Sequence, residues 1–162
     1  MTSQQSILDV FNFSLEDRAE IAKLDLELED EAKLADEEWQ KIMSNINQCL
    51  EEAMKIEGAI GAALVDWNSG MCLGTAGGGN FNLEIAAAGN TEVVRSKLKV
   101  MQSLGLKDHI EDILISLGNQ YHLIRLSSDH PDLFLYLVLN RSQANLALAR
   151  YKLSQLDPLL KL

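Results

Sequence analysis

The sequence predicts an α+β protein, in which a central five-stranded antiparallel sheet is flanked by helices and preceded by an acidic helical extension. Apolar residues recur at helical spacing through the first third of the chain, and the period changes to that of strands after Gly58. Nine of the ten glycines also follow Gly58, so the two parts differ in composition. We assign residues 1–36 to the extension and residues 37–162 to the domain, with the element order α-β-β-α-β-β-β-α.

An uninterrupted apolar stripe predicts one long helix before Gly58. Its members alternate steps of four and three residues: Leu28, Ala32, Ala35, Trp39, Ile42, Ile46, Cys49, Ala53 and Ile56. This spacing places them on one narrow helix face, which suits packing against a second helix or a sheet. We expect the helix over 38–56 to cover the sheet, so that Trp39 and the stripe around it are part of the core and not a docking surface. Residues 14–17 have the pattern of a capping box, and Gly58 is the expected stop.

The domain elements follow Gly58 in an order set by apolar period and turn residues. They are strands over 59–65, 71–75, 110–117, 121–126 and 133–139, a helix from residue 83 toward residue 105, and a last helix over 146–156. The middle helix contains Gly89 and Asn90, which weaken helices, so its continuity at that point stays open. Strands this apolar need cover on both faces, which predicts helices on both sides of the sheet.

The predicted strand over 110–117 lacks most of the usual protection of an edge strand. Glu111 and Asp112 bring charge to its start, and the residues that follow are largely apolar. An exposed apolar edge in a soluble protein predicts pairing, most simply with a second copy of the chain.

Charge and composition exclude several classes of protein. Acidic side chains number 24 and basic ones 14, and the net charge of -10 disfavours nucleic-acid binding, which rests on Lys and Arg. No apolar run reaches the ~18 residues of a membrane span, and the first residues lack a signal-peptide pattern. The two cysteines, Cys49 and Cys72, lie in apolar stretches, which excludes a disulfide framework. We expect a reduced, cytoplasmic protein without membrane insertion.

The sequence contains no pattern typical of a catalytic, cofactor or metal site. The glycine-rich stretch 74–79 lacks the Lys-Ser/Thr ending of a phosphate loop and does not fit GxGxxG, so we expect a flexible connector. His109, His122 and His130 lack the spacing of a metal-ligand set. Neither cysteine has a neighbouring base or positive charge to activate its thiolate. We therefore expect a protein that is not an enzyme and holds no cofactor.

From Ile56 to Asp157 the chain resembles the roadblock family, named for the dynein light chains, in its bacterial, MglB-like type. Three stretches carry the resemblance: 58–70 for the opening hairpin, 113–124 for the third and fourth strands, and 133–150 for the last strand and helix. Residues 1–36 have no counterpart in the family core.

The resemblance implies a roadblock/profilin-like fold and a homodimer whose third strands pair across a two-fold axis, beside the middle helices. It also implies a non-enzymatic scaffold, often for a small Ras-like GTPase or a signalling complex. By position, the strand pairing would use Ile113, Leu114, Ile115 and Leu117, and the helix seam Val94, Leu98 and Met101. The alternative is a PAS- or GAF-like small-ligand sensor, which would need an enclosed pocket with convergent polar groups.

The extension has two candidate roles beyond solvation. A weaker apolar stripe with acidic flanks runs through Leu8, Phe11, Leu15, Ala22 and Leu26. This stripe could bind a partner or fold over the middle helix, where the densest basic patch consists of Arg95, Lys97 and Lys99. A run of charge is also typical of a merely solvated face, so these interpretations stay open.

Overall fold

The computed structural model describes residues 13–162, and the chain divides into two compact units, Met1–Lys41 and Ile42–Leu162. The first helix, α2 (Leu15–Met54), begins in the first unit and ends in the second. The predicted boundary after residue 36 falls within this helix. Leu8 and Phe11 of the weaker stripe lie outside the described residues, whereas Leu15 and Leu26 are exposed.

The start of α2 is a capping box, as predicted. The Asp17 backbone N–H donates to Ser14 Oγ at 3.1 Å, and the Ser14 backbone N–H donates to Asp17 Oδ2 at 3.0 Å. The backbone N–H groups of Ser14 and Asp17 are thus each bonded to the side chain of the other residue. The Ser14 hydroxyl also donates to Asp17 Oδ2 at 2.6 Å, and this bond, together with the one from the Ser14 backbone N–H, lowers the pKa of the Asp17 carboxyl.

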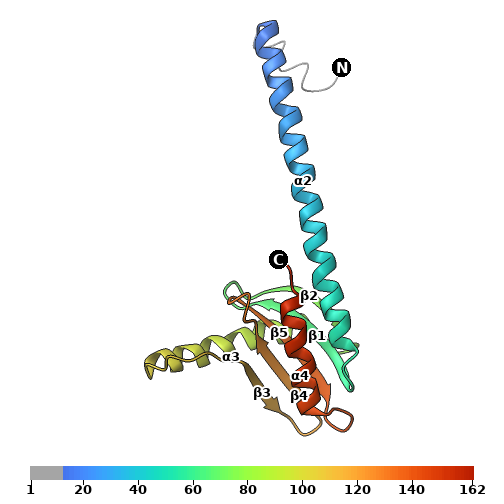
Figure 1. Cartoon of the computed structure of the whole chain (residues 1–162), viewed down its shortest axis with the longest axis vertical. Helices are drawn as coiled ribbons and strands as arrows, with labels where there is room; N and C mark the ends of the chain where they lie inside the picture. Colours follow the sequence, from blue (N-terminus) through green and yellow to red (C-terminus); the bar gives the residue numbers. More distant parts are fainter. Residues whose placement is uncertain (1–12) are drawn as a thin grey trace. The chain divides into compact units, whose positions relative to one another are not determined.

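The second unit is built around one five-stranded antiparallel sheet, with the strands labelled in Figure 1. The strands are β1 (Ala59–Asp66), β2 (Met71–Gly77), β3 (Asp112–Ser116), β4 (Gln120–Leu126) and β5 (Leu133–Asn140). Their spatial order is β2-β1-β5-β4-β3, so the apolar β5 is central and β2 and β3 are the outer strands. The predicted α+β class, strand number and element order are confirmed.

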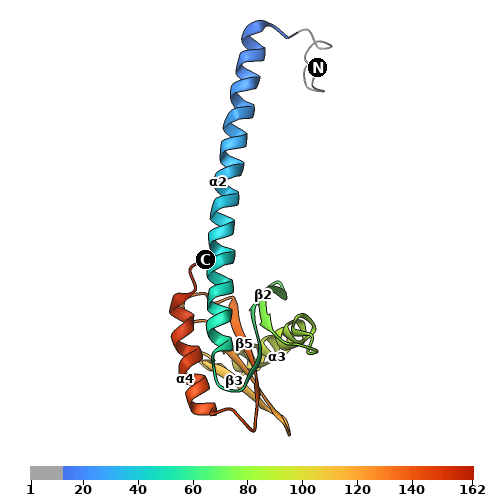
Figure 2. The same ribbon diagram turned by 90° about the vertical axis from the view of Figure 1, so that its right-hand side faces the viewer.

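Helices cover both faces of this sheet (Figure 2). The helix α3 (Leu83–Ser103) packs on one face, where Val65, Phe134 and Tyr136 are buried. The end of α2 from Ile42 and the helix α4 (Leu146–Leu156) pack on the other. Successive residues of β5 enter the two cores alternately, because a strand points its side chains to opposite faces.

The apolar stripe of α2 is buried only in part. Ile46, Cys49 and Ala53 lie in the sheet core, which confirms that the end of this helix covers the sheet. Trp39 is 59% exposed, so the expectation of a core role for this side chain is wrong. The compact second unit begins at Ile42, and helical periodicity alone does not indicate where a stripe gains its cover.

Three other elements refine the sequence-based expectations. α3 is continuous through Gly89. The helix has buried residues both before and after this exposed glycine, and this packing on the sheet keeps the segment helical. β3 is shorter than the predicted strand over 110–117. After α4, a 3-10 turn, η1 (Asp157–Leu159), begins at the residue before Pro158.

Candidate interaction surface

The outer strand β3 offers an unpaired backbone edge. Among residues 13–162 it pairs only with β4, through a register that runs from Asp112 opposite Arg125 to Ser116 opposite Tyr121. Ile113 and Ile115 pack on the core beneath α3, and Leu114 on the opposite core. All three are half-buried, so β3 combines a free hydrogen-bonding edge with apolar side chains on both faces.

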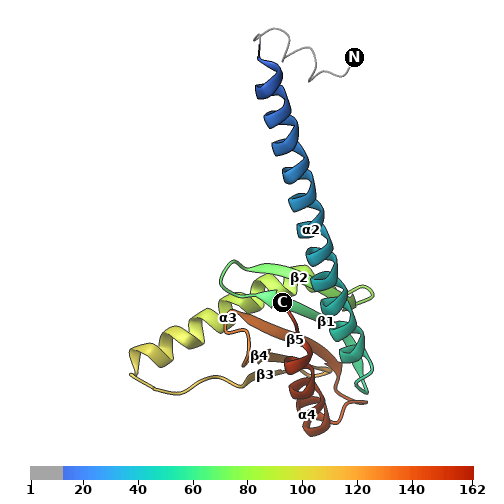
Figure 3. The same cartoon turned by 45° about the horizontal axis from the view of Figure 1, so that its top comes forward.

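A second apolar surface lies on α3. Ile85, Val93, Val100 and Leu104 at its C-cap are 72%, 37%, 46% and 67% exposed. Their spacing places them on one side of the helix, away from the side that packs on the sheet. The last turns of α3 extend past β3 (Figures 1 and 3). The C-terminal part of this apolar surface and the free edge of β3 therefore lie on the same side of the domain. We call these four residues the α3 face.

The structure places the predicted seam residues on the inner side of α3. Val94 is fully buried, Met101 is 9% exposed and Leu98 is half-buried, and Val94 and Leu98 belong to the core between α3 and the sheet. Leu117 is exposed just after β3. The α3 face escaped sequence reasoning because the inner stripe explained the helix. The sequence feature that could have indicated the α3 face is the set of apolar residues of this helix that do not belong to the inner stripe.

The predicted basic patch is divided in the structure. Arg95 donates from Nη1 to Glu92 at 2.7 Å and from Nη2 to the Asn68 carbonyl at 2.6 Å. This side chain thus ties α3 to the turn between β1 and β2. Lys97 and Lys99 are exposed. Of the three candidates for docking, these two lysines keep their charge at the surface.

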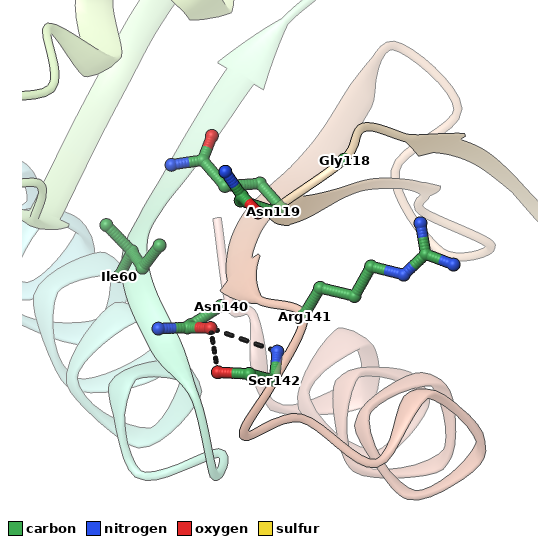
Figure 4. A pocket seen from close by; sticks show the side chains of 7 residues that line it. Ile60, Gly118, Asn119, Asn140, Arg141 and Ser142 are labelled. Carbon is green, nitrogen blue, oxygen red and sulfur yellow. Dashed lines mark hydrogen bonds between the residues drawn. The ribbon is translucent and has the colours of Figure 1, made fainter.

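An open cavity of about 540 Å³ lies beside the start of β1, the end of β5 and the turn between β3 and β4 (Figure 4). Asn140 Oδ1 accepts hydrogen bonds from the Ser142 backbone N–H and from Ser142 Oγ. Arg141 points away from Ile60, donates to the Leu117 carbonyl at 3.0 Å and lies 5.3 Å from the Tyr121 ring centre. The side chains of Asn140, Arg141 and Ser142 are thus engaged with the chain itself, which does not favour a ligand sensor with convergent free polar groups.

The histidines flagged by the sequence lie apart from one another. His122 contacts the Phe81 and Tyr136 rings beneath α3, and burial lowers its pKa. His130 lies near the C-terminal residues, where its Nε2 is 3.2 Å from the Leu160 carbonyl, and His109 is exposed. Among the described residues, no three His, Cys, Asp or Glu side chains are grouped as metal ligands.

The glycine-rich stretch and the cysteines also have structural positions. The connector expected over 74–79 is shorter in the structure, because residues 74–77 belong to β2 and only Gly78 and Gly79, both with positive φ, follow the strand on the way to α3. Burial raises the pKa of Cys49 to about 11 and also raises that of Cys72. Each thiol is thus held in its less reactive, protonated form at neutral pH.

The order of elements, the antiparallel sheet and the helices on its two faces define a roadblock-type fold. Among solved structures, this fold matches Myxococcus xanthus MglB, with 18% identity, a TM-score of 0.61, and coverage of 76% of this chain and 87% of that chain. The gliding protein MglB of Thermus thermophilus matches with 17% identity and a TM-score of 0.62, over 74% of this chain and 87% of that one. The chain therefore has an MglB-type roadblock fold.

A third structure of the same fold is a Roadblock/LC7 domain from Streptomyces avermitilis. It shares 11% identity and a TM-score of 0.58, over 70% of this chain and 89% of that one. No family model matches the sequence, and no curated protein matches it. The helices of residues 13–162 include none that is long and apolar enough to cross a membrane.

Proposed function

We propose that the protein is a cytoplasmic, homodimeric and non-enzymatic module that scaffolds or regulates a small Ras-like GTPase or a signalling complex. The observation that carries this proposal is the free edge of β3 beside the exposed α3 face. A second copy related by a two-fold axis would extend the sheet through β3 and bring the two α3 faces together. The acidic extension over 1–36 is an appendage to the domain over 37–162.

The energetics favour such a dimer. Burial of an exposed Val, Leu or Ile side chain contributes ~1.5–3 kcal/mol. Two copies of the α3 face place eight side chains in the interface, four from each chain, and because these are 37–72% exposed each contributes roughly half of that value. The sum exceeds the low end of the ~4–15 kcal/mol lost in translational and rotational freedom on association. Backbone hydrogen bonds between the two β3 strands would also fix how the two copies are aligned and oriented.

The experiment for the dimer compares two substitutions of equal chemistry. Val100→Glu places a charge in the α3 face, whereas Leu148→Glu places one on α4 at a similar exposure, 41% against 46%. Light scattering during size-exclusion chromatography should give a dimer for the parent chain and for Leu148→Glu, and a monomer for Val100→Glu. A parent chain that is monomeric at micromolar concentration would overturn the homodimer.

The GTPase part of the proposal rests on the likeness to the MglB structures. Its test uses a purified small Ras-like GTPase from the same genome, loaded with GDP or with a non-hydrolysable GTP analogue. Nucleotide-dependent binding to the dimer supports the proposal, and the GTP hydrolysis rate then separates regulation from simple holding. The proposal would be overturned if no such GTPase bound the dimer in either nucleotide state. The fold does not favour the PAS- or GAF-like alternative.

A further inference from the structure

The first unit carries an exposed apolar stripe at coiled-coil spacing. Leu28, Ala32, Ala35 and Trp39 follow one another at steps of four, three and four residues within α2. Such steps keep side chains on one face of a helix of 3.6 residues per turn. Leu28 and Trp39 are 63% and 59% exposed, and both alanines are exposed. We call these four residues the Trp39 seam.

Carboxylates flank the Trp39 seam on both sides. Glu31 and Glu38 follow one side, seven residues apart, and Glu29 and Asp36 follow the other, also seven apart. These are the positions that border the apolar seam in a coiled coil, where charge determines which partner helix is accepted. All four side chains are exposed. The seam is therefore an apolar strip between two acidic rows.

The lysines of this unit lie on the other side of α2. Helical spacing places Lys23, Lys33 and Lys41 away from the Trp39 seam. Residues 1–41 hold 12 acidic and four basic side chains, so the unit has a formal charge of -8. The negative potential next to the seam is thus not offset by lysines beside it, and cations are the complementary flanks.

This charge pattern argues against a second copy as the occupant. In a parallel pair of α2 helices, Glu31 of one copy would face Asp36 of the other. In an antiparallel pair, acidic rows would again face acidic rows. Like charges across an interface disfavour that pairing. Residues 1–12 of this chain are no better complement, because they contain Asp9 and no Lys or Arg.

We propose that the Trp39 seam is a docking site for a basic amphipathic helix of another protein. Such a helix would place apolar side chains on Leu28 and Trp39 and Lys or Arg side chains beside the two acidic rows. Trp39 supplies the large aromatic anchor, because tryptophan combines a wide apolar area with few rotatable bonds. The site uses no residue of the α3 face or of β3, so it adds a second binding surface to the proposed dimer.

The test uses the full chain and a synthetic helical peptide of about four heptads, with Leu at the seam positions and Lys at both flanks. A second peptide carries Glu in place of every Lys. Fluorescence anisotropy of the labelled peptides measures the dissociation constant, and the emission of Trp39 is followed in a Trp67→Phe background. The Lys peptide should bind and shift Trp39 emission to the blue, and added salt should weaken the complex. The Glu peptide should not bind.

Leu28 and Leu34 provide a matched pair of variants, because both are 63% exposed and their positions differ by about 120° around the same helix, which places Leu34 off the Trp39 seam. Leu28→Glu should weaken binding of the Lys peptide about tenfold or more, and Leu34→Glu by less than about twofold. The double variant Glu31→Lys/Glu38→Lys should shift preference toward the Glu peptide. These results together support the docking site.

Three outcomes would overturn the proposal. Equal losses in Leu28→Glu and Leu34→Glu would mean that binding does not use the seam. Dissociation of the parent oligomer by Leu28→Glu, seen by light scattering, would assign the seam to a second copy. Equal binding of the Lys peptide and the Glu peptide to the parent chain would mean that the acidic rows do not select the partner.

Discussion

Arg150 on α4 donates two hydrogen bonds to Asp112 on β3, from Nε to Oδ2 at 2.9 Å and from Nη2 to Oδ1 at 2.7 Å. The Asp112 side chain is 6% exposed, and Arg125 Nη1 lies 3.9 Å from its Oδ2. The outer strand β3 is thus attached at its start to a helix on the sheet face. Its unpaired edge is held in place by this bidentate contact without being covered by it.

Removal of the Asp112 carboxylate should therefore destabilise the second unit. Asp112→Ala leaves Arg150 without its hydrogen-bond acceptor and Arg125 without its ion-pair partner, and we expect the free energy of unfolding to fall by about 2 kcal/mol. Urea denaturation followed by circular dichroism measures it. Asp108→Ala is the control, because that side chain is 77% exposed. Equal effects of the two substitutions would show that the contact between Arg150 and Asp112 contributes nothing specific.

Stability should depend on pH through His122. The Tyr136 hydroxyl lies 2.8 Å from His122 Nδ1, and burial lowers the pKa of His122 below its ordinary 6.5. The folded state therefore binds fewer protons than the unfolded state just below pH 6.5. The stability contributed by neutral His122 is present above that pH and is lost as the pH falls toward the lowered pKa.

The measurement is the free energy of unfolding between pH 7.5 and pH 5, for the parent chain and for His122→Gln. We expect the decrease on acidification to be smaller in His122→Gln, because glutamine does not titrate. His109→Gln, at an exposed position, is the control and should keep the parent's dependence. An unchanged slope in His122→Gln would contradict the assignment.

Gly89 should be replaceable by alanine with a gain in stability. It lies inside α3 without positive φ, and an added Cβ would meet nothing within 4 Å. Because glycine in a helix interior costs about 0.5–1 kcal/mol relative to alanine, Gly89→Ala should raise the free energy of unfolding by that amount.

Gly61 is the contrasting position in the same experiment. A Cβ there would lie 2.9 Å from Leu83 Cδ2 and 3.0 Å from the Gly78 backbone nitrogen. Gly61→Ala should lower the free energy of unfolding by about 1–3 kcal/mol, because β1 and the linker after β2 would have to separate. A neutral Gly61→Ala would contradict the close packing of this hairpin on α3.

Both thiols should react slowly in the folded protein. Burial raises the pKa of Cys49 to about 11, so its thiolate is about one part in a thousand at pH 8. Alkylation by iodoacetamide, followed by mass spectrometry, should label half-buried Cys72 before buried Cys49. Urea should make both rates similar. Faster labelling of Cys49 in the folded state would contradict its position in the sheet core.

The candidate interaction surface was only partly foreseeable. The sequence predicted that residues 110–117 form an apolar strand at an open edge of the sheet, and β3 has that outer position. The helix seam is different, because α3 carries apolar residues on two sides. Periodicity identifies that a stripe exists but not which stripe meets the sheet. Only the packed structure distinguishes Val94, which is buried, from Val93 and Val100, which remain exposed.

Local chemistry in the sequence was enough to determine the elements themselves. Turn residues placed the hairpins, the pattern at Ser14 and Asp17 placed the start of α2, and the change of period at Gly58 separated helix from strands. These signals act over a few residues, so they are visible without a fold. Tertiary structure decided the rest: the strand order, the buried side of α3 and the contact of Arg150 with Asp112. Each depends on residues far apart in the chain, and their meeting is determined by how whole elements pack.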